Sequence, residues 1–380
     1  MKSIRQNYFI LGLLLTVFLS ISFLVYKQAF SSSYASDTDE HIIFIYLYLY
    51  NSEPFYIPHP LWHYGVSITS SVLFISIEHA AAIFSAILVT GWTYIIYKIV
   101  KNNLPLLKDY MQILITFIII IIGPLCIPWY NKIIFLGQGS PNIWHNVTLW
   151  TVKPFAVIAV YFLVEAVRTK NSLYYLYVFG SVIISLFAKP SFAIMFLPAI
   201  FVYMLVENIQ TKQFRVFYIL TILFSSSILL YQFIHTFNSG DSKVIFDFLG
   251  VWSESSQNIA LSIVLALAFP MLFLLLEPKI INDDYILLAW IQVFIGIILY
   301  ACLAQTGKYY LHGNFGWSYT IAMSIVYIFS IVKFFKIYNE VLKLKRYVLL
   351  LLLATQVGIG LYYYIKVLEG QNPMYIAIFL

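Results

Sequence analysis

The sequence predicts an all-α protein built as a polytopic transmembrane helical bundle. Of its 380 residues, 62% are hydrophobic and 19% are aromatic, while only 10% are charged. This is more apolar surface than one water-exposed core can bury. The apolar residues form long runs separated by short polar turns, and the runs lack the alternation of a membrane β-barrel strand. Because no linker divides the chain, we treat residues 1–380 as one integral-membrane domain.

The apolar runs define about eleven candidate membrane-spanning helices. A spanning helix needs roughly 20 apolar residues. The first run follows a basic N-terminus and extends from Phe9 to Tyr26, a length that favours an uncleaved anchor over a secretory signal. The predicted spans cover residues 8–26, 70–97, 110–129, 153–167, 173–188, 191–206, 214–234, 258–276, 285–304, 316–332 and 347–365.

The distribution of lysine and arginine predicts the orientation of these spans. With a cytoplasmic N-terminus, all four arginines and most lysines fall in inner loops, and the C-terminus is external. The net charge of +6 then reflects anchoring at the inner surface of the lipid bilayer, and we infer no nucleic-acid partner. Richness in Ile, Lys, Tyr and Asn favours a bacterial source, hence the cytoplasmic (inner) membrane.

The first external loop, residues 27–66, carries the densest polar cluster of the chain. The run Asp37-Thr38-Asp39-Glu40-His41 follows the first span, and Pro58-His59-Pro60-Leu61-Trp62-His63-Tyr64 leads into the second. Between them, an apolar run is too short to cross a bilayer. Three carboxylates at a membrane surface indicate proton transfer or metal binding. The alternative is a solvated helix N-terminus capped by Thr38 or Asp37.

A second external turn runs from Gly137 to Asn146 and ends in Trp144 and His145. Glycine, proline and asparagine account for the turn itself. An aromatic face beside a hydrogen-bonding group is the arrangement that sugars use. Lys153 follows shortly after, at the start of the next predicted span.

Two further external turns place a lysine at a helix end on the side where lysine is scarce. These are Lys189 and Lys308, the latter followed by His312. Such lysines suit an anionic ligand such as a lipid phosphate, although lysine also anchors helix ends without any ligand. The candidate substrate-binding residues are therefore His41, His59, Trp62, His63, Trp144, His145, Lys153, Lys189, Lys308 and His312.

The first loop resembles that of the GT-C superfamily of membrane glycosyltransferases. The resemblance rests on an N-terminal membrane helix, on the acidic pair Asp39-Glu40 in the first external loop, and on the Pro58-His59-Pro60-Leu61-Trp62-His63 segment before the second span. The motifs cover residues 37–64, while the architecture covers nearly the whole chain.

This resemblance implies transfer of a sugar from a polyprenyl-phosphate donor on the external face, with inversion at the anomeric carbon. It implies that a loop aspartate is the general base; Asp39 matches the family position best, and Asp37 is the alternative, with Glu40 beside them. The acceptor is expected to be a cell-envelope glycan or lipid. No cofactor is assigned, although Asp37, Asp39 and Glu40 offer the oxygen ligands that Mg²⁺ or Mn²⁺ takes.

Three other functions stay open. A polysaccharide polymerase or ligase of the O-antigen type has a similar number of spans but relies on arginines in its outer loops, where this chain has none. A membrane transporter places charges or broken helices near the middle of the bilayer. A histidine-dependent membrane acyltransferase is a further enzymatic alternative.

Overall fold

The computed structural model describes most of the chain. It leaves out residues 1, 32, 33, 35, 51–55, 128–130, 132, 133, 212–215, 238–241 and 372–380, and it describes the backbone alone for residues 2–7 and 208–211. Parts of the predicted 27–66 loop and of the predicted spans 110–129 and 214–234 therefore lie outside the described residues.

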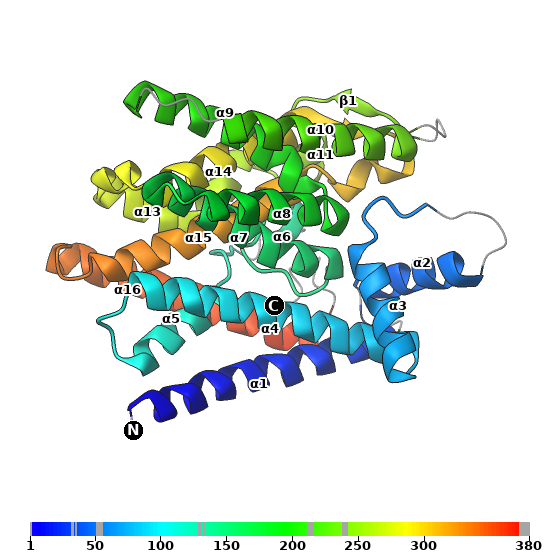
Figure 1. The fold of residues 1–380 in the computed structure, drawn as a ribbon, viewed down its shortest axis with the longest axis horizontal. Coiled ribbons are helices and arrows are strands. Elements are labelled where there is room, and N and C mark those ends of the chain that lie inside the picture. Colours follow the sequence, from blue (N-terminus) through cyan, green and yellow to red (C-terminus); the bar gives the residue numbers. More distant parts are fainter. Residues whose placement is uncertain are drawn as a thin grey trace.

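The fold is a bundle of helices with a single two-stranded antiparallel ribbon, β1 with β2, among the described residues. Most of the long helices run along the longest axis of the molecule (Figure 1). The elements are α1 (Lys2–Phe30), α2 (Thr38–Tyr50), α3 (Leu61–Leu73), α4 (Ile77–Asn103), α5 (Asp109–Ile121), α6 (Ile134–Gly137), α7 (Val147–Thr169), α8 (Ser172–Ala188), α9 (Ser191–Thr211), α10 (Val216–Phe237), β1 (Val244–Phe246), α11 (Gly250–Ser255), α12 (Ile259–Ala266), α13 (Ala268–Leu276), η1 (Pro278–Asn282), α14 (Asp284–Cys302), β2 (Leu303–Gln305), η2 (Gly307–His312), α15 (Gly316–Lys336) and α16 (Lys343–Leu368).

The helical bundle predicted from composition is confirmed. Fewer than eleven of its helices, however, are long enough to count as membrane spans. Within the described residues, seven helices are long and apolar enough to cross a membrane, or eight if the bent pair α12–α13 is one span. The other predicted spans fall on the shorter apolar helices α5, α8 and α9. Eleven spans therefore remain a prediction.

The predicted span 258–276 is a helix broken between α12 and α13, with a bend of 79°. Proline lacks an N–H and its ring clashes with the carbonyl four residues earlier, and Pro270 stands four residues after Ala266. The freed Ala266 carbonyl instead accepts a hydrogen bond from the Tyr327 hydroxyl at 2.8 Å, and Gln356 donates to the same hydroxyl at 2.6 Å. Polar side chains of α15 and α16 thus satisfy the break.

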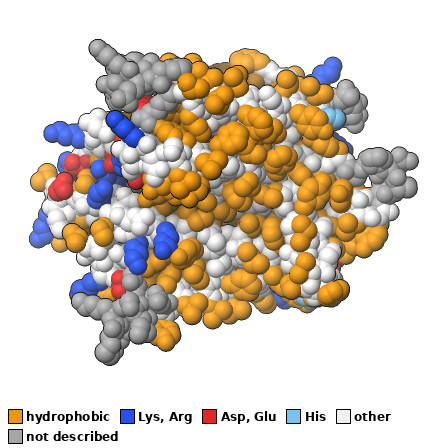
Figure 2. Space-filling view, in the orientation of Figure 1, with side chains coloured by type: hydrophobic (Ala, Val, Ile, Leu, Met, Phe, Trp, Pro, Cys, Tyr) orange, Lys and Arg blue, Asp and Glu red, His pale blue; other side chains and the backbone are white. Residues whose placement is uncertain are grey.

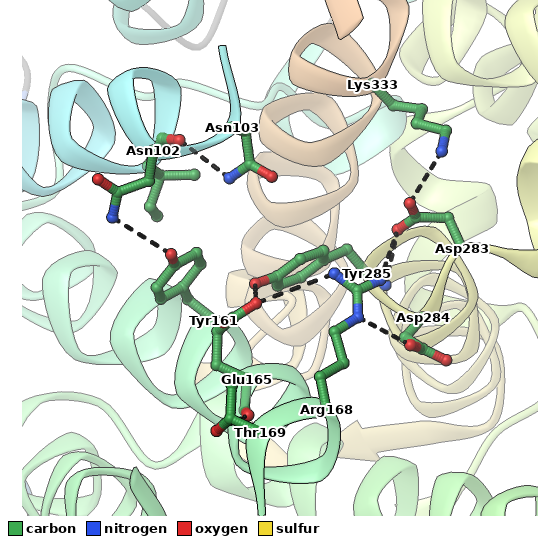
Figure 3. Close-up of polar contacts among 11 residues, drawn as sticks. Asn102, Asn103, Tyr161, Glu165, Arg168, Thr169, Asp283, Asp284, Tyr285 and Lys333 are labelled. Atoms are coloured by element: carbon green, nitrogen blue, oxygen red, sulfur yellow. Dashed lines mark hydrogen bonds and ion pairs between the residues drawn. The ribbon is translucent and has the colours of Figure 1, made fainter. Parts of the chain in front are cut away.

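Polar residues divide between the two ends of the bundle. Figure 2 shows a broad apolar surface with lysine, arginine and acidic side chains gathered mainly toward one end. At that end Arg168 of α7 bonds to Asp284 through Nε and Oδ2 at 3.0 Å, and Lys333 of α15 meets Asp283 at 2.9 Å (Figure 3). We call this the basic end, and the opposite end, where α2 and α3 lie, the histidine end.

Candidate active site

The site is built on the N-terminus of α7, where Asn146 acts as the cap. Its Oδ1 accepts hydrogen bonds from the Leu149 backbone N–H at 2.8 Å and from the Thr148 hydroxyl at 3.0 Å. These two bonds satisfy one free N–H of the first turn and fix which way the amide faces. Its Nδ2 therefore points away from the helix and donates a short hydrogen bond to Oδ2 of Asp37.

Lys189, in the turn between α8 and α9, reaches the same cap from the other side. Its Nζ donates to the Thr148 hydroxyl at 2.8 Å and lies 3.5 Å from Asn146 Oδ1. The ammonium also stands 4.8 Å from the centre of the Trp317 ring, a cation–π distance. The side chain is only 7% exposed, so one carboxylate and one ammonium lie on opposite sides of a single amide.

Four histidines lie near this pair: His41, His59 and His145 are close enough to be affected by the Lys189 charge, and His63 contacts His41. His41 Nδ1 lies 3.0 Å from His63 Nε2, and the His59 ring centre is 6.2 Å from that of His41 and 6.4 Å from that of His63. His145 is buried; its Nδ1 lies 3.2 Å from the Tyr363 hydroxyl, while its Nε2 has no hydrogen-bond partner among the described residues.

Burial sets the charge states of these groups. It raises the pKa of Asp37 to about 6, even though Lys189 acts in the opposite direction, and it lowers the pKa of Lys189 to about 8. Burial also lowers the pKa of His59 and His145 to about 3 and of His63 to about 4. Near pH 7 the site therefore holds an aspartate, an ammonium and neutral imidazoles.

The first loop is tied to the 144–146 turn by backbone and amide bonds. The Asp37 N–H donates to the His145 carbonyl at 3.0 Å. Gln28, in the last turn of α1, accepts from the Thr38 hydroxyl at 3.1 Å and donates to the Trp144 carbonyl at 2.8 Å. These contacts fix Asp37 against the bundle rather than leaving it on a free loop.

The other predicted carboxylates lie apart from this arrangement. Asp39 and Glu40 are exposed in the first turn of α2, where Asp39 Oδ1 accepts the Glu40 N–H at 2.9 Å. That position is favourable for acids because the helix N-terminus is electropositive. Asp39 and Glu40 thus fit the alternative of a solvated helix N-terminus, whereas Asp37 is partly buried and hydrogen-bonded to Asn146.

The predicted lysines divide in the same way. Lys189 belongs to the site, whereas Lys308 and His312 are exposed in η2 and Lys308 stacks over Tyr309. Lys153 is buried, but its Nζ donates to the Pro141 carbonyl at 3.0 Å and to Asn142 Oδ1 at 2.9 Å, so it holds the 141–142 turn.

The predicted tryptophans pack beside the site rather than in it. Trp62 is fully buried, donates to Ser85 Oγ at 3.0 Å and backs His41 at 6.0 Å between ring centres. Trp144 is buried against Tyr364. Sequence reasoning missed Asn146 and Trp317 as site residues, although an asparagine directly before an apolar run is a recognisable helix start.

An apolar groove of about 410 Å³ opens beside the site between α3, α8, α10 and the turn before α3. Its volume lies within the range of about 300–1,000 Å³ typical of ligand pockets. Pro58 and Pro60, which flank His59, form one wall, and Phe187, two residues before Lys189, contributes to another. Ile228, Tyr231 and Gln232 of α10 line the groove as well.

The described residues contain no group of three His, Cys, Asp or Glu side chains placed to hold a metal ion. No protein-family model, curated protein or solved structure matches the chain.

Proposed function

We propose that the protein is a membrane glycosyltransferase that moves a sugar from a polyprenyl-phosphate donor to a cell-envelope glycan or lipid. One observation carries the proposal: Asp37 and Lys189 meet on the two sides of Asn146 at the histidine end of the bundle. A base and a fixed cation are the two groups that transfer from a phosphate-linked sugar requires.

The proposed reaction assigns each group one task. The acceptor hydroxyl oxygen attacks the anomeric carbon of the sugar while its proton passes to the Asp37 carboxylate. The bond between that carbon and the phosphate oxygen breaks, and the polyprenyl phosphate leaves with the electron pair. Lys189 neutralises the leaving phosphate, and attack from the face opposite the phosphate inverts the anomeric centre.

The environment of both groups favours these tasks. A pKa of about 6 for Asp37 leaves it ionised at neutral pH and more basic than a surface aspartate, as a general base requires. Lys189 is buried beside Trp317, where water screens its charge weakly. Neutral histidines beside the pair offer hydrogen bonds to sugar hydroxyls without adding charge.

The proposal is tested with the protein purified into nanodiscs. Undecaprenyl phosphate carrying one ¹⁴C-labelled hexose is supplied, with glucose, galactose and mannose tried in turn. Octyl glucoside and monooctanoylglycerol, each with at least two free hydroxyls, serve as acceptors. Transfer of label to an acceptor, lost in Asp37→Asn, is the expected result. A parallel assay uses the protein in sealed vesicles. Label that crosses the vesicle bilayer without transfer to an acceptor would favour the transporter alternative, which the broken helix α12–α13 keeps open.

The sidedness of the site is tested separately by thiol labelling. In a background with Cys126→Ser and Cys302→Ser, Glu40→Cys should react with a membrane-impermeant maleimide in intact cells. Lys170→Cys, exposed at the basic end, should react only after lysis. The reverse pattern would place the site on the cytoplasmic side and remove the case for an external polyprenyl-linked donor.

A further inference from the structure

We propose that the groove between α3, α8 and α10 binds the lipid acceptor of the reaction. The groove holds the apolar chain of the lipid, and one lipid hydroxyl donates a hydrogen bond to Gln232 Oε1. This inference rests on the proposed function, because it identifies the bound lipid as the acceptor of the sugar. The groove and its polar atom are features of the structure alone.

Gln232 is the polar contact that singles this groove out. Its side chain lines the groove and is only 5% exposed. Its Nε2 donates to two backbone carbonyls, Pro58 at 2.9 Å and Leu186 at 3.0 Å, whereas its Oε1 is buried without a partner among the described residues. An unpaired buried acceptor costs about 1–3 kcal/mol, so a ligand that donates to it removes that cost.

The orientation of the amide is fixed by its neighbours. Reversing it would place Oε1 against the Pro58 and Leu186 carbonyls, which have no hydrogen to donate, and would lose both bonds. The atom left for a ligand is therefore an acceptor, and the ligand must supply an O–H or N–H group.

This requirement separates the acceptor's hydroxyl from the donor's phosphate. The sugar of the donor also carries hydroxyls, but it must lie between Asp37 and Lys189 to react. The phosphate head of the donor is an anion that accepts hydrogen bonds, so it suits Lys189 and would be repelled by a bare carbonyl oxygen in an apolar groove. The acceptor must carry a free hydroxyl to react at all. A lipid with two or more hydroxyls can bind one to Gln232 and present another to Asp37.

The groove is also connected to the reacting groups through Gln232. The amide bonds α10 to the turn that carries His59 and to the end of α8, three residues before Lys189. A hydroxyl-bearing lipid seated there would lie beside the turn that carries His59, with its chain between Phe187 and Ile228.

The test is photo-cross-linking in nanodiscs with a diazirine-tagged dioctanoylglycerol, which needs no turnover. Cross-links are expected on Tyr56 to Tyr64 and on Phe224 to Gln232. Unlabelled dioctanoylglycerol should compete about tenfold better than its O-methyl ether, which is ~1.4 kcal/mol, and better than farnesyl phosphate. Gln232→Leu should abolish the preference for alcohol over ether.

A matched pair of variants on α10 provides the structural control. Ile228→Trp fills the groove and should prevent labelling, whereas Leu230→Trp, on the exposed side of the same helix, should not. Equal competition by alcohol and ether in the unmodified protein, or stronger competition by farnesyl phosphate, would overturn the inference. Labelling as expected without any sugar transfer would sustain the groove and instead reject the proposed glycosyltransferase.

Discussion

The two ends of the bundle hold buried or half-buried charges in opposite ways. At the basic end, Arg168 meets Glu165, Asp283 and Asp284 directly, and Lys333 shares Asp283 (Figure 3). At the histidine end, Asp37 and Lys189 are joined through the neutral amide of Asn146. At the basic end the charged groups neutralise one another in direct ion pairs. At the histidine end a neutral amide lies between the carboxylate and the ammonium, so a base and a cation remain available to a substrate.

Solvent exposure sharpens this difference. The charged side chains of the basic network are 14–36% exposed, and pairs of that kind contribute little to stability, typically below about 1 kcal/mol. The histidine end instead buries Lys189 and His145. A protein tolerates such costs mainly where function requires them.

Removing the carboxylate of Asp37 should have the largest effect on activity. Asp37→Asn keeps the shape of the side chain but cannot accept the acceptor proton, so the initial transfer rate should fall by about 10²–10⁴-fold. Asp39→Asn is the matched control and should leave the rate nearly unchanged, since Asp39 is exposed. Loss of activity in Asp39→Asn alone would return the base to the position that the GT-C resemblance favours.

Removing the Lys189 charge should have the next largest effect. Lys189→Met keeps the length of the chain but no longer neutralises the leaving phosphate, and the rate should fall by about 10²–10³-fold, measured as initial rate against donor concentration. Lys308→Met, at an exposed lysine of the same end, should behave like the unmodified protein. Equal effects of the two substitutions would mean that the donor phosphate binds elsewhere.

The pH dependence should reflect both groups. Asp37 must be ionised, so the rate should fall as the pH drops below about 6. Lys189 must be protonated, so it should fall again as the pH rises above about 8. The profile of kcat/KM should be bell-shaped. Lys189→Met should lose the alkaline limb and keep the acidic one, moved to higher pH because Lys189 lowers the pKa of Asp37. An alkaline limb that persists in Lys189→Met would assign it to another group.

Disrupting the basic end should have the smallest effect on catalysis. Arg168→Gln removes the shared partner of three carboxylates and should lower stability by about 1 kcal/mol or less, measured by denaturation of the detergent-solubilised protein, with the transfer rate unchanged. Lys153→Met should destabilise more, by about 1–3 kcal/mol, because the Pro141 carbonyl and Asn142 Oδ1 lose a buried donor. A large loss of turnover in Arg168→Gln would show that the two ends are coupled.

The sequence by itself determined that the chain is a helical membrane protein. The free energy of transferring an apolar run into lipid is the sum over its own side chains. It does not depend on which runs become neighbours in the bundle. The same locality exposes the positions of chemical interest, since the acidic run Asp37 to Glu40 and the histidines His59 and His63 stand out from a chain that is otherwise apolar.

Only the tertiary structure decided which of those residues come together. Asp37 and Asn146 are 109 positions apart and Lys189 is 43 positions beyond Asn146, so their meeting depends on how four helices pack. Asp37 and Asp39 are two positions apart at the start of α2, so their side chains point in different directions. Asp37 lies against the α7 cap, and Asp39 lies in solvent. No local pattern encodes that choice, because both residues are equally favourable at a helix N-terminus.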